Sequence, residues 1–476
     1  MTVRTRMAPS PTGEYHIGHI RTLLYNYALA RQQNGQFIIR IEDTDQKRLV
    51  PGATEAILQV IKDYGLSWDE GPDIGGPYQP YIQTDRLPIY QRHIQELLAK
   101  EKVYYCFCTP DRLAKMHQDQ KAQKQLPKYD RHCLHLNPQE IQTNLDNNVP
   151  YVIRLKVPDN EDIIFTDAIR GTIKINTTEI DDQVLIKSDG IPTYHFAAAV
   201  DDHLMNITHI LRGDEWISST PKAILIYRYF GWELPVFAHL PVFLDPSGQG
   251  KMSKRKGTVS ARSFLDDGYL PEALLNFLML LGWNPGTNQE IFSLEEFVKI
   301  FSLEHVHKKQ PIFDRAKLDY LNGLYLRQLS DNEYISRLQP FIPQADTQTL
   351  KALCPLIKER SSTLKSTAQM IAFLFTDIQA DPKLFLSDKI TPPIAKAMVQ
   401  AMVTIMKQIS DPKDTAKLQS QCLDSIKNNN WKTGDFFMVL RVAITGSRFT
   451  PPIIESLAFL SKEKIIARLQ ALEANL

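Results

Sequence analysis

The first part of the chain places a strand, a helix and a second strand within about forty residues, and this order limits the fold more than any other feature of the sequence. Residues 3–7 have the pattern of a short strand, and the run FIIRIE at residues 37–42 has that of a second. Between them, apolar residues from Ile17 to Ala28 repeat at helical spacing. Two strands joined by one helix in so short a span run parallel, with a right-handed crossover. The sequence therefore predicts a parallel α/β sheet whose ligands bind beyond the carboxyl ends of the strands.

The loop between the first strand and the helix has the composition of an anion-binding site. It lies in the stretch PSPTGEYHIGHIRTLL, residues 9–24. His16 and His19 lie at the helix N-terminus, where orphan N–H groups attract a phosphate and two imidazoles three residues apart can donate to the same anion. Gly13 and Gly18 allow a nucleotide to approach the backbone closely. The alternative, which this stretch alone leaves open, is a surface turn that happens to contain two histidines.

A second cationic stretch, KMSKRKG at residues 251–257, follows the turn-rich sequence DPSGQG. The spacing of Lys251 and Lys254 suits a flexible lid that closes over a polyphosphate. Such a loop can deliver positive charge in the transition state, and only binding that is stronger there than in the ground state accelerates a reaction. The alternative is a solvated basic turn.

Size and composition indicate a multidomain, cytoplasmic protein. The chain has 476 residues, more than the ~250–300 that one core supports, so several domains are expected. It is 43% hydrophobic and 23% charged, with a net charge of +1. The N-terminus lacks the apolar stretch of a signal peptide, and no run approaches the ~20 apolar residues of a membrane span. Five cysteines, an odd number, favour a reducing compartment over a secreted disulfide scaffold.

Taken together, HIGH at residues 16–19 and KMSK at residues 251–254 resemble the signature pair of the class I aminoacyl-tRNA synthetases. Other stretches resemble the bacterial-type glutamyl-tRNA synthetases: RMAPSPTG at 6–13, RIEDTD at 40–45, DEGPD at 69–73, KSDGIPTYHFA at 187–197, VDDHLMNITHILRGDEWISSTPK at 200–222, GYLPEALLNFLMLLGW at 268–283, FDRAKLDYLNG at 313–323 and ITGSRFTPP at 444–452. The similarity covers essentially the whole chain, and its motifs are most specific up to about residue 325.

This resemblance implies a two-step reaction without a covalent enzyme intermediate. The α-carboxylate of L-glutamate attacks the α-phosphate of ATP to give glutamyl-adenylate and pyrophosphate, and the 3′-terminal ribose of tRNA then takes the glutamyl group. Positioning and electrostatic stabilisation drive such chemistry. The implied catalytic residues are His16, His19, Lys251 and Lys254. The implied ATP site consists of these four with Gly18, Glu215 and Ser253, and Mg²⁺ is the expected counterion.

The resemblance also implies a glutamate site made of Arg6, Ala8, Ser10, Glu42, Tyr194, Arg212 and Trp216. Arg6, Arg212 and Tyr194 are expected to hold the side-chain carboxylate, because a planar guanidinium pairs with a carboxylate through two parallel bonds. Glu42 is expected to take the α-ammonium, and Trp216 to pack nearby. An uncharged glutamine would leave the two arginines short of partners, so we expect its rejection.

Three charged residues near this implied site could have a structural role instead of binding a ligand. Arg212 would have no ligand role if it formed an ion pair with Asp214 or Glu215. For Asp43 and Asp45, we expect helix capping or loop structure instead of a contact with substrate.

Four residues form a candidate zinc site, in the pattern C-x-C followed by C-x-H. Cys106, Cys108, Cys133 and His135 supply three thiolates and an imidazole, a complete tetrahedral set that predicts a structural Zn²⁺. Some glutamyl-tRNA synthetases resemble this chain in carrying the same quartet. The alternative is that these cysteines pack in a core, as we expect for Cys354 and Cys422.

The expected fold is a Rossmann-type α/β catalytic domain with an α+β insertion, followed by an all-α C-terminal anticodon-binding region. The predicted ranges are 1–85 and 196–250 for the two catalytic halves, 86–195 for an insertion that holds the tRNA acceptor stem, 251–325 for a stem-contact domain with the KMSK loop, and 326–476 for the helical anticodon-binding domains. The last range has apolar residues at helical spacing, as in IIESLAFLSKEKIIARLQAL. A helical tail resembles the bacterial-type enzymes, whereas glutaminyl and archaeal-type relatives use β-barrels.

The expected partners are tRNA(Glu), L-glutamate and ATP, and tRNA(Gln) is left open as a further substrate. No contact with a membrane is expected, and the chain is expected to be a monomer. A net charge of +1 requires local basic stretches for tRNA, and the candidates are HVHKKQ at 305–310 and KERSSTLKS at 358–366. Both stretches have the alternative of a solvated helix face. Lys358 and Arg360 lie where the family is expected to read the anticodon.

Other families remain as alternatives. A glutaminyl-tRNA synthetase fits the helical C-terminus less well, and a short paralogue that glutamylates a tRNA base lacks an anticodon domain. An inactive tRNA-binding relative is expected to lose HIGH or KMSK, and both are intact. A nucleotidyltransferase of the same fold has no reason to carry an anticodon-type tail.

Overall fold

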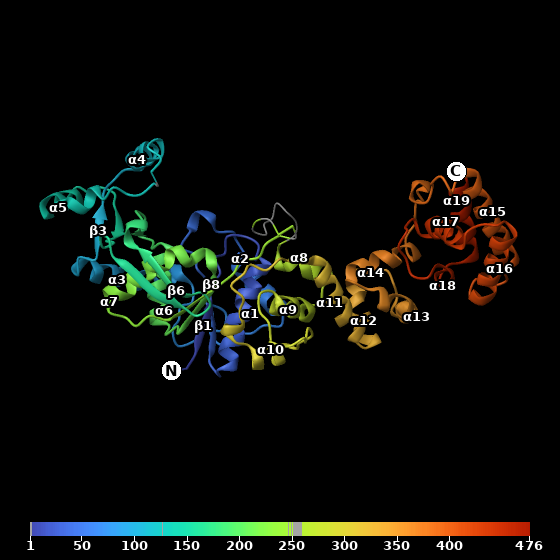
Figure 1. Ribbon diagram of the computed structural model, residues 1–476, viewed down its shortest axis with the longest axis horizontal. Helices are drawn as coiled ribbons and strands as arrows, with labels where there is room; N and C mark the ends of the chain where they lie inside the picture. Colours follow the sequence, from blue (N-terminus) through green and yellow to red (C-terminus); the bar gives the residue numbers. More distant parts are fainter. Residues whose placement is uncertain (1, 126, 246, 249, 251–258) are drawn as a thin grey trace. The chain divides into compact units, whose positions relative to one another are not determined.

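The computed structural model describes residues 2–125, 127–245, 247, 248, 250 and 259–476, and Figure 1 shows its ribbon. The chain divides into two compact units. Unit 1 comprises Met1–Ser263 and Leu274–Asp314, and unit 2 comprises Phe264–Ala273 and Arg315–Leu476. The chain therefore passes from one unit to the other at three points along the sequence.

Unit 1 begins with the βαβ unit that the sequence predicts. Strand β1 (Arg4–Met7) pairs in parallel with β2 (Gln36–Ile39), and helix α1 (Ile17–Gln32) makes the crossover. Buried residues occur around most of α1, which is the pattern of a helix enclosed by its neighbours. Tyr25, for example, packs on Phe297 of helix α10 (Leu294–Ile300). The helix is therefore fixed firmly enough to position the loop at its N-terminus.

A second βαβ unit supplies the other half of this fold. Strands β8 (His209–Gly213) and β9 (Val236–Leu240) are parallel, and α7 (Thr220–Phe230) connects them. The backbone N–H of Thr208 donates to the carbonyl of Arg4 at 3.0 Å, which places the start of β8 beside β1. The two halves of the Rossmann-type fold therefore adjoin, although 204 residues separate Arg4 from Thr208.

An α+β insertion lies between these halves in the sequence, as predicted. Three strands form an antiparallel sheet: β3 (Val103–Cys106), β4 (Val152–Leu155) and β7 (Val184–Ile186). The hairpin of β5 (Asp162–Asp167) and β6 (Gly171–Asn176) extends the second parallel pair in the order β6-β5-β9-β8. The insertion also contains the helices α3 (Leu87–Ala99), α4 (Pro110–Ala122) and α5 (Pro138–Asp146), whereas α2 (Ala53–Asp63) precedes it and α6 (Tyr194–Leu204) begins at its end. Figure 1 shows α4 and α5 next to β3 and away from β1.

The described part of unit 2 contains helices and no strand, which confirms the predicted all-α C-terminal region. Its helices are α11 (Arg315–Gln328), α12 (Asp331–Leu338), α13 (Thr347–Ile357), α14 (Leu364–Ile371), α15 (Pro392–Gln408), α16 (Thr415–Asn428), α17 (Thr433–Thr445), α18 (Ile453–Leu457) and α19 (Lys462–Glu473). Helices α8 (Ala261–Asp266) and α9 (Pro271–Leu280) each run across a boundary between the units. Cys354 and Cys422 are buried in the core of unit 2, as expected.

Within the described residues, the structure has no helix with both the length and the apolar character that a bilayer span requires.

Candidate active site

A cavity of about 1030 Å³ opens at the carboxyl ends of the strands of unit 1. Residues at the ends of β1 and β8 line it, together with the first turn of α1, which is where an α/β sheet of this kind binds its ligand. The cavity brings together all the predicted ligand residues that the structure describes: Arg6, Ala8, Ser10, His16, Gly18, His19, Glu42, Tyr194, Arg212, Glu215 and Trp216. Lys251, Ser253 and Lys254 lie outside the described residues.

The HIGH loop forms the N-terminus of α1. His16 is the N-cap residue, and its Nδ1 accepts a hydrogen bond of 2.9 Å from the backbone N–H of Gly18. Because Nδ1 accepts, the ring proton resides on Nε2 when the imidazole is neutral, so Nε2 is the atom that can donate to an anion. The His16 and His19 rings have centroids 6.0 Å apart, close enough to serve one ligand. A Cβ at position 18 would lie 3.0 Å from His16 Nδ1, so glycine keeps this cap free of crowding.

Segments before and after the undescribed stretch 251–258 contact the start of α1. After it, Val259 accepts a hydrogen bond of 2.8 Å from the N–H of Ile17, and the N–H of Ala261 donates to Tyr15 at 2.8 Å. Before it, the Phe243 ring lies 4.4 Å from the Arg21 guanidinium carbon, one turn into α1. The segment directly after the KMSK stretch is therefore held at the start of α1, and Phe243, farther upstream, packs on the first turn of the same helix.

Arg212 reaches the cavity from the end of β8. Its Nε donates to His239 Nε2 at 3.1 Å, and its Nη2 donates to Thr220 Oγ1 at 2.8 Å. It makes no ion pair with any described residue, and Asp214 pairs with Arg170 instead. The alternative of a structural ion pair between Arg212 and Asp214 or Glu215 is therefore wrong. The Tyr194 and Trp216 rings, 4.6 Å apart, lie beside the guanidinium and complete an aromatic wall.

Arg6 lies deeper and already has a carboxylate partner. Its Nε and Nη2 donate to the two oxygens of Asp202 at 3.0 and 3.2 Å, and both side chains are buried. The expectation of two arginines in need of an acidic ligand therefore changes: Arg6 is paired within the protein, whereas Arg212 has only neutral partners. Arg212 is therefore an under-paired cation at the end of β8, whereas Arg21, which also lines the cavity, donates to the backbone carbonyls of Leu281 and Pro241.

Glu42 belongs to a buried network of charged residues behind the cavity. Arg40 donates to Glu42 at 2.8 Å and to Asp202 at 2.8 Å, and Arg86 donates to Asp201 at 2.7 Å. Burial raises the pKa of Glu42 to about 7, against the lowering effect of the Arg40 guanidinium. A carboxyl with this pKa is only partly ionised at neutral pH, and a cationic ligand beside it would lower the pKa and favour the carboxylate.

Sequence reasoning did not assign Arg40, Asp201 or Asp202 to the site, although two signals point to them. Arg40 precedes Glu42 by two residues in an extended segment, so both side chains lie on one face. Asp201 and Asp202 follow the apolar run AAAV in α6, and two acids in such a helix require buried partners. By contrast, Asp43 has the structural role that we expected: its carboxylate accepts from the backbone N–H of Thr84 at 2.9 Å. Asp45 pairs with Arg48 in the same loop.

A second candidate site lies in the insertion, at the end of β3. The Sγ atoms of Cys106, Cys108 and Cys133 lie within 4.8 Å of one another, with Cys106 and Cys133 buried. His135 is exposed and does not belong to this group, so the predicted quartet is incomplete. The physical reason is the 3₁₀ turn His132–His135, in which residues two apart point about a third of a turn away from each other. The Tyr129 hydroxyl instead lies 3.3 Å from the sulfurs of Cys106 and Cys108.

Lys358 and Arg360, the two residues expected to read the anticodon, both bond to groups of unit 2. Lys358 Nζ donates to the carbonyl of Leu329 and pairs with Asp331 at 2.8 Å. Arg360 Nη1 donates to the carbonyl of Leu356 at 3.3 Å. Both side chains therefore have partners within unit 2.

The fold, the HIGH loop at its strand ends and the helical C-terminal unit together define a class I tRNA synthetase. A family model described as "tRNA synthetases class I (E and Q), catalytic domain" matches residues 2–320, and one described as "Anticodon binding domain" matches residues 333–472. The second match counts against a short paralogue without an anticodon domain.

Full-length relatives narrow this class. The glutamate–tRNA ligase of Clostridium botulinum strain Eklund 17B is 41% identical over 474 residues, with 98% of each chain covered. That of Clostridioides difficile strain 630 is 40% identical, with 100% of each chain covered. The crystal structure of a glutamate tRNA ligase from Elizabethkingia meningosepticum, in complex with its amino acid, is similar over 100% of both chains, with a TM-score of 0.81 and 32% identity. The chain belongs to the glutamate–tRNA ligase family.

Proposed function

We propose that this chain activates L-glutamate with ATP and transfers it to the 3′ end of tRNA(Glu) for protein synthesis. The observation that supports this most directly is the cavity itself, where the HIGH loop and an arginine without a carboxylate partner line the same space. The full-length similarity to glutamate–tRNA ligases supports the same reaction. Membership of the class implies the use of ATP with Mg²⁺.

In this proposal the phosphates of ATP bind at the N-terminus of α1. His16 and His19 donate to them from the HIGH loop, Gly18 leaves room for the nucleotide, and the exposed Glu215 contacts the rest of ATP. Lys251, Ser253 and Lys254 act on the same phosphates, with the two lysines bringing charge to the transition state. Support for the second group is the attachment of Val259 and Ala261 to the start of α1, with Phe243 packed on the first turn of that helix.

L-Glutamate binds in the deeper part of the cavity. Arg212 takes the side-chain carboxylate, with Arg6 and Tyr194 beside it, and Glu42 takes the α-ammonium. Ala8 and Ser10 line the turn after β1, and Trp216 packs against Tyr194. Glutamine is rejected because its amide cannot neutralise the partly buried Arg212 guanidinium, which has only neutral partners.

The insertion holds a structural zinc ion in this proposal. Three sulfurs within 4.8 Å of one another are a suitable donor set for Zn²⁺, and burial of two of them would protect the bonds from exchange. The Tyr129 hydroxyl, which lies 3.3 Å from the sulfurs of Cys106 and Cys108, would supply the fourth ligand in place of His135.

Finer features of the function are proposed on the family resemblance. Residues 1–85 and 196–250 form the two halves of the catalytic domain, and the insertion between them, residues 86–195, holds the acceptor stem. Residues 251–325 contact the stem, and residues 326–476 read the anticodon. The enzyme acts as a monomer in the cytoplasm, where its five free cysteines are stable. Charging of tRNA(Gln) in addition to tRNA(Glu) is the second candidate activity.

Glutamate-dependent pyrophosphate exchange and aminoacylation test the proposal. Purified protein with ATP, Mg²⁺ and [¹⁴C]glutamate is expected to charge tRNA(Glu) and to show exchange when tRNA is present. Parallel reactions with tRNA(Gln) decide whether the enzyme discriminates between the two tRNAs. Charging of tRNA with glutamine, and not with glutamate, would overturn the assignment.

A further inference from the structure

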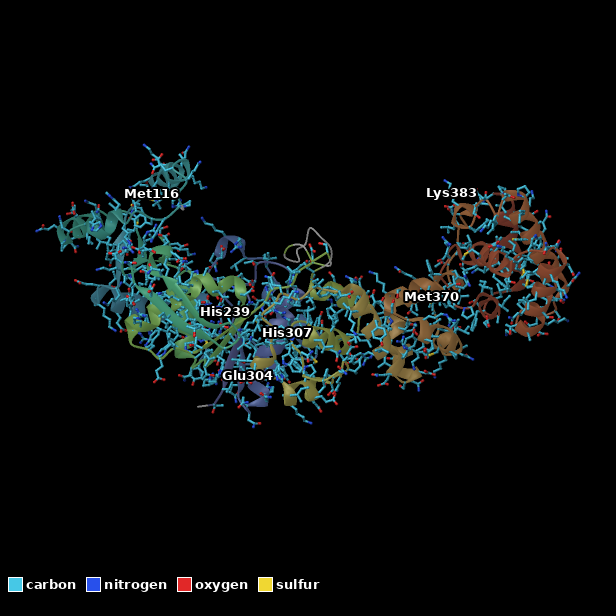
Figure 2. The ribbon with its side chains drawn as sticks, in the orientation of Figure 1. Met116, His239, Glu304, His307, Met370 and Lys383 are labelled. Atoms are coloured by element: carbon cyan, nitrogen blue, oxygen red, sulfur yellow. The ribbon has the colours of Figure 1, made fainter. Side chains whose placement is uncertain are left out.

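Two buried side chains behind Arg212 form a hydrogen-bonded chain that the proposed reaction does not use. His239 lies opposite Arg212 in the parallel ladder of β8 and β9, and Figure 2 labels it in unit 1. Its Nε2 lies 3.1 Å from Arg212 Nε, and its Nδ1 lies 2.6 Å from Asp167 Oδ2. His239 has no exposed surface and Asp167 is 1% exposed, so water does not compete for these bonds.

The direction of each hydrogen bond follows from the donor in the arginine. An arginine Nε–H can only donate, so His239 Nε2 accepts and the ring proton resides on Nδ1. That proton is donated to Asp167, whose Oδ1 also accepts from the backbone N–H groups of Ile169 and Arg170 at 3.0 and 2.8 Å. Burial lowers the pKa of His239, and the Arg212 charge lowers it further against the opposing effect of Asp167. The imidazole is therefore neutral and fixed in one tautomer.

This chain gives Arg212 an orientation without giving it a carboxylate. Thr220 Oγ1 accepts from Nη2 at 2.8 Å, so two of the three guanidinium nitrogens are held by the protein. Nη1 makes no hydrogen bond to any residue that the structure describes, and it remains for a ligand on the cavity side. Arg6 shows the contrasting arrangement, since both oxygens of Asp202 occupy its Nε and Nη2.

From this geometry we infer that His239, held by Asp167, is a positioning residue that aims Arg212 at the side-chain carboxylate of glutamate and thereby contributes to the rejection of glutamine. The inference rests on the proposed role of Arg212. A neutral acceptor suits this task because a carboxylate at the place of His239 would neutralise Arg212 directly and remove its preference for an acidic ligand. The negative charge of Asp167 is kept one imidazole away, where it supports the tautomer instead.

The test compares His239→Asn with His239→Gln in the full-length enzyme. The asparagine amide reaches the place of Nδ1 and can still donate to Asp167, but it leaves Arg212 Nε without an acceptor. The glutamine amide reaches the place of Nε2 and can accept from Arg212. His239→Asn is expected to raise the KM for glutamate roughly tenfold or more, with the KM for ATP unchanged, and to reduce discrimination against glutamine. His239→Gln is expected to restore most of the loss.

His209→Asn is the matched control, because His209 is a partly buried histidine in the same strand as Arg212 and contacts Thr208 instead of the cavity. It should leave both KM values unchanged. If His239→Asn fails to fold, Thr220→Val provides the second variant, since Thr220 Oγ1 accepts from Arg212 Nη2 at 2.8 Å and lies 3.1 Å from His239 Nε2, so its loss should loosen both side chains and raise the glutamate KM several-fold.

Arg212→Lys separates the inference from the function on which it rests. If this variant keeps the wild-type glutamate KM, the proposed role of Arg212 fails. If Arg212→Lys impairs glutamate use while His239→Asn and Thr220→Val behave as wild type, the positioning role of His239 is overturned and the proposed function stands. Equal loss of glutamate and ATP use in both His239 variants would indicate a merely structural role and would also overturn the inference.

Discussion

Arg6 donates two hydrogen bonds to Asp202, whereas Arg212 meets only an imidazole and a hydroxyl. The residues of the proposed glutamate site were assigned from the family resemblance of the motifs that carry them, and the structure places them in one cavity. The partner of each arginine was not predictable from the sequence, since Asp202 follows Arg6 by 196 residues and only the folded chain brings them together. Only the structure therefore shows that Arg6 has a carboxylate partner within the protein and that Arg212 does not.

Replacement of Arg212 by cysteine tests the under-paired cation. Arg212→Cys should lower kcat/KM for glutamate by about 10- to 100-fold, because a hydrogen bond to a charged group contributes about 1.5–3 kcal/mol. The KM for ATP should stay near the wild-type value in steady-state aminoacylation. Arg228→Ala is the control, because Arg228 pairs with Glu161 at the surface of unit 1 and does not line the cavity. An unchanged glutamate kcat/KM in Arg212→Cys would contradict the assignment.

The raised pKa of Glu42 predicts a pH dependence for glutamate. The pKa is about 7 in the folded protein, above its ordinary value of 4.5, so the carboxylate that pairs with the α-ammonium is lost as pH falls below 7. We expect kcat/KM for glutamate to rise between pH 6 and about 8 and then to level off, since this parameter reports ionisation of the free enzyme. The kcat/KM for ATP, measured in the same buffers, separates Glu42 from the histidines of the HIGH loop, which would affect both. A flat glutamate profile would refute the role of Glu42.

At the scale of elements, periodicity was a sufficient guide where packing repeats along one segment. The βαβ unit and the helical C-terminal region follow the spacing of their apolar residues, and both are confirmed. The zinc candidate shows where spacing is insufficient. A 3₁₀ turn at residues 132–135 directs His135 away from Cys133. The amino-acid sequence does not distinguish this turn from one that would bring the imidazole toward the three sulfurs.

Metal content tests that turn directly. Purified wild-type protein should contain about one zinc per chain by mass spectrometry of the metals, and Cys133→Ser should contain far less. His135→Asn should retain the metal, because His135 is exposed and lies outside the sulfur group. Cys354→Ser, which alters a buried cysteine of unit 2, is the control for the loss of a thiol alone. Loss of zinc in His135→Asn would restore the quartet that the sequence predicts.

At the scale of the whole molecule, residues far apart in sequence contribute to one site. Val259 and Ala261 form backbone hydrogen bonds with Ile17 and Tyr15 at the start of α1, from which more than 240 residues separate them in the chain. The sequence suggested this meeting only through the family resemblance, since hydrogen bonds across such a distance leave no periodic signal.

Lys254→Ala tests whether that stretch acts in the transition state. Turnover should fall by about 100-fold or more, while the KM for ATP rises only slightly, because charge that arrives with the transition state lowers kcat and not ground-state binding. Rapid-quench measurement of adenylate formation separates this step from tRNA charging. Lys299→Ala, in the exposed part of α10, should be neutral. Equal effects of Lys254→Ala on turnover and on ATP affinity would point to simple phosphate binding.

The three passages of the chain between its two units have a consequence for proteolysis. Phe264–Ala273 belongs to unit 2, where Leu270 is buried in the core and the carbonyl of Gly268 accepts from the N–H of Leu364 at 3.0 Å. After a single cut near residue 314, the helical fragment would therefore still be held to the remainder of the chain by noncovalent packing on residues 264–273. Severing the molecule into separate fragments requires cuts at all three crossings, so a protease that nicks one linker would leave a single particle by size-exclusion chromatography.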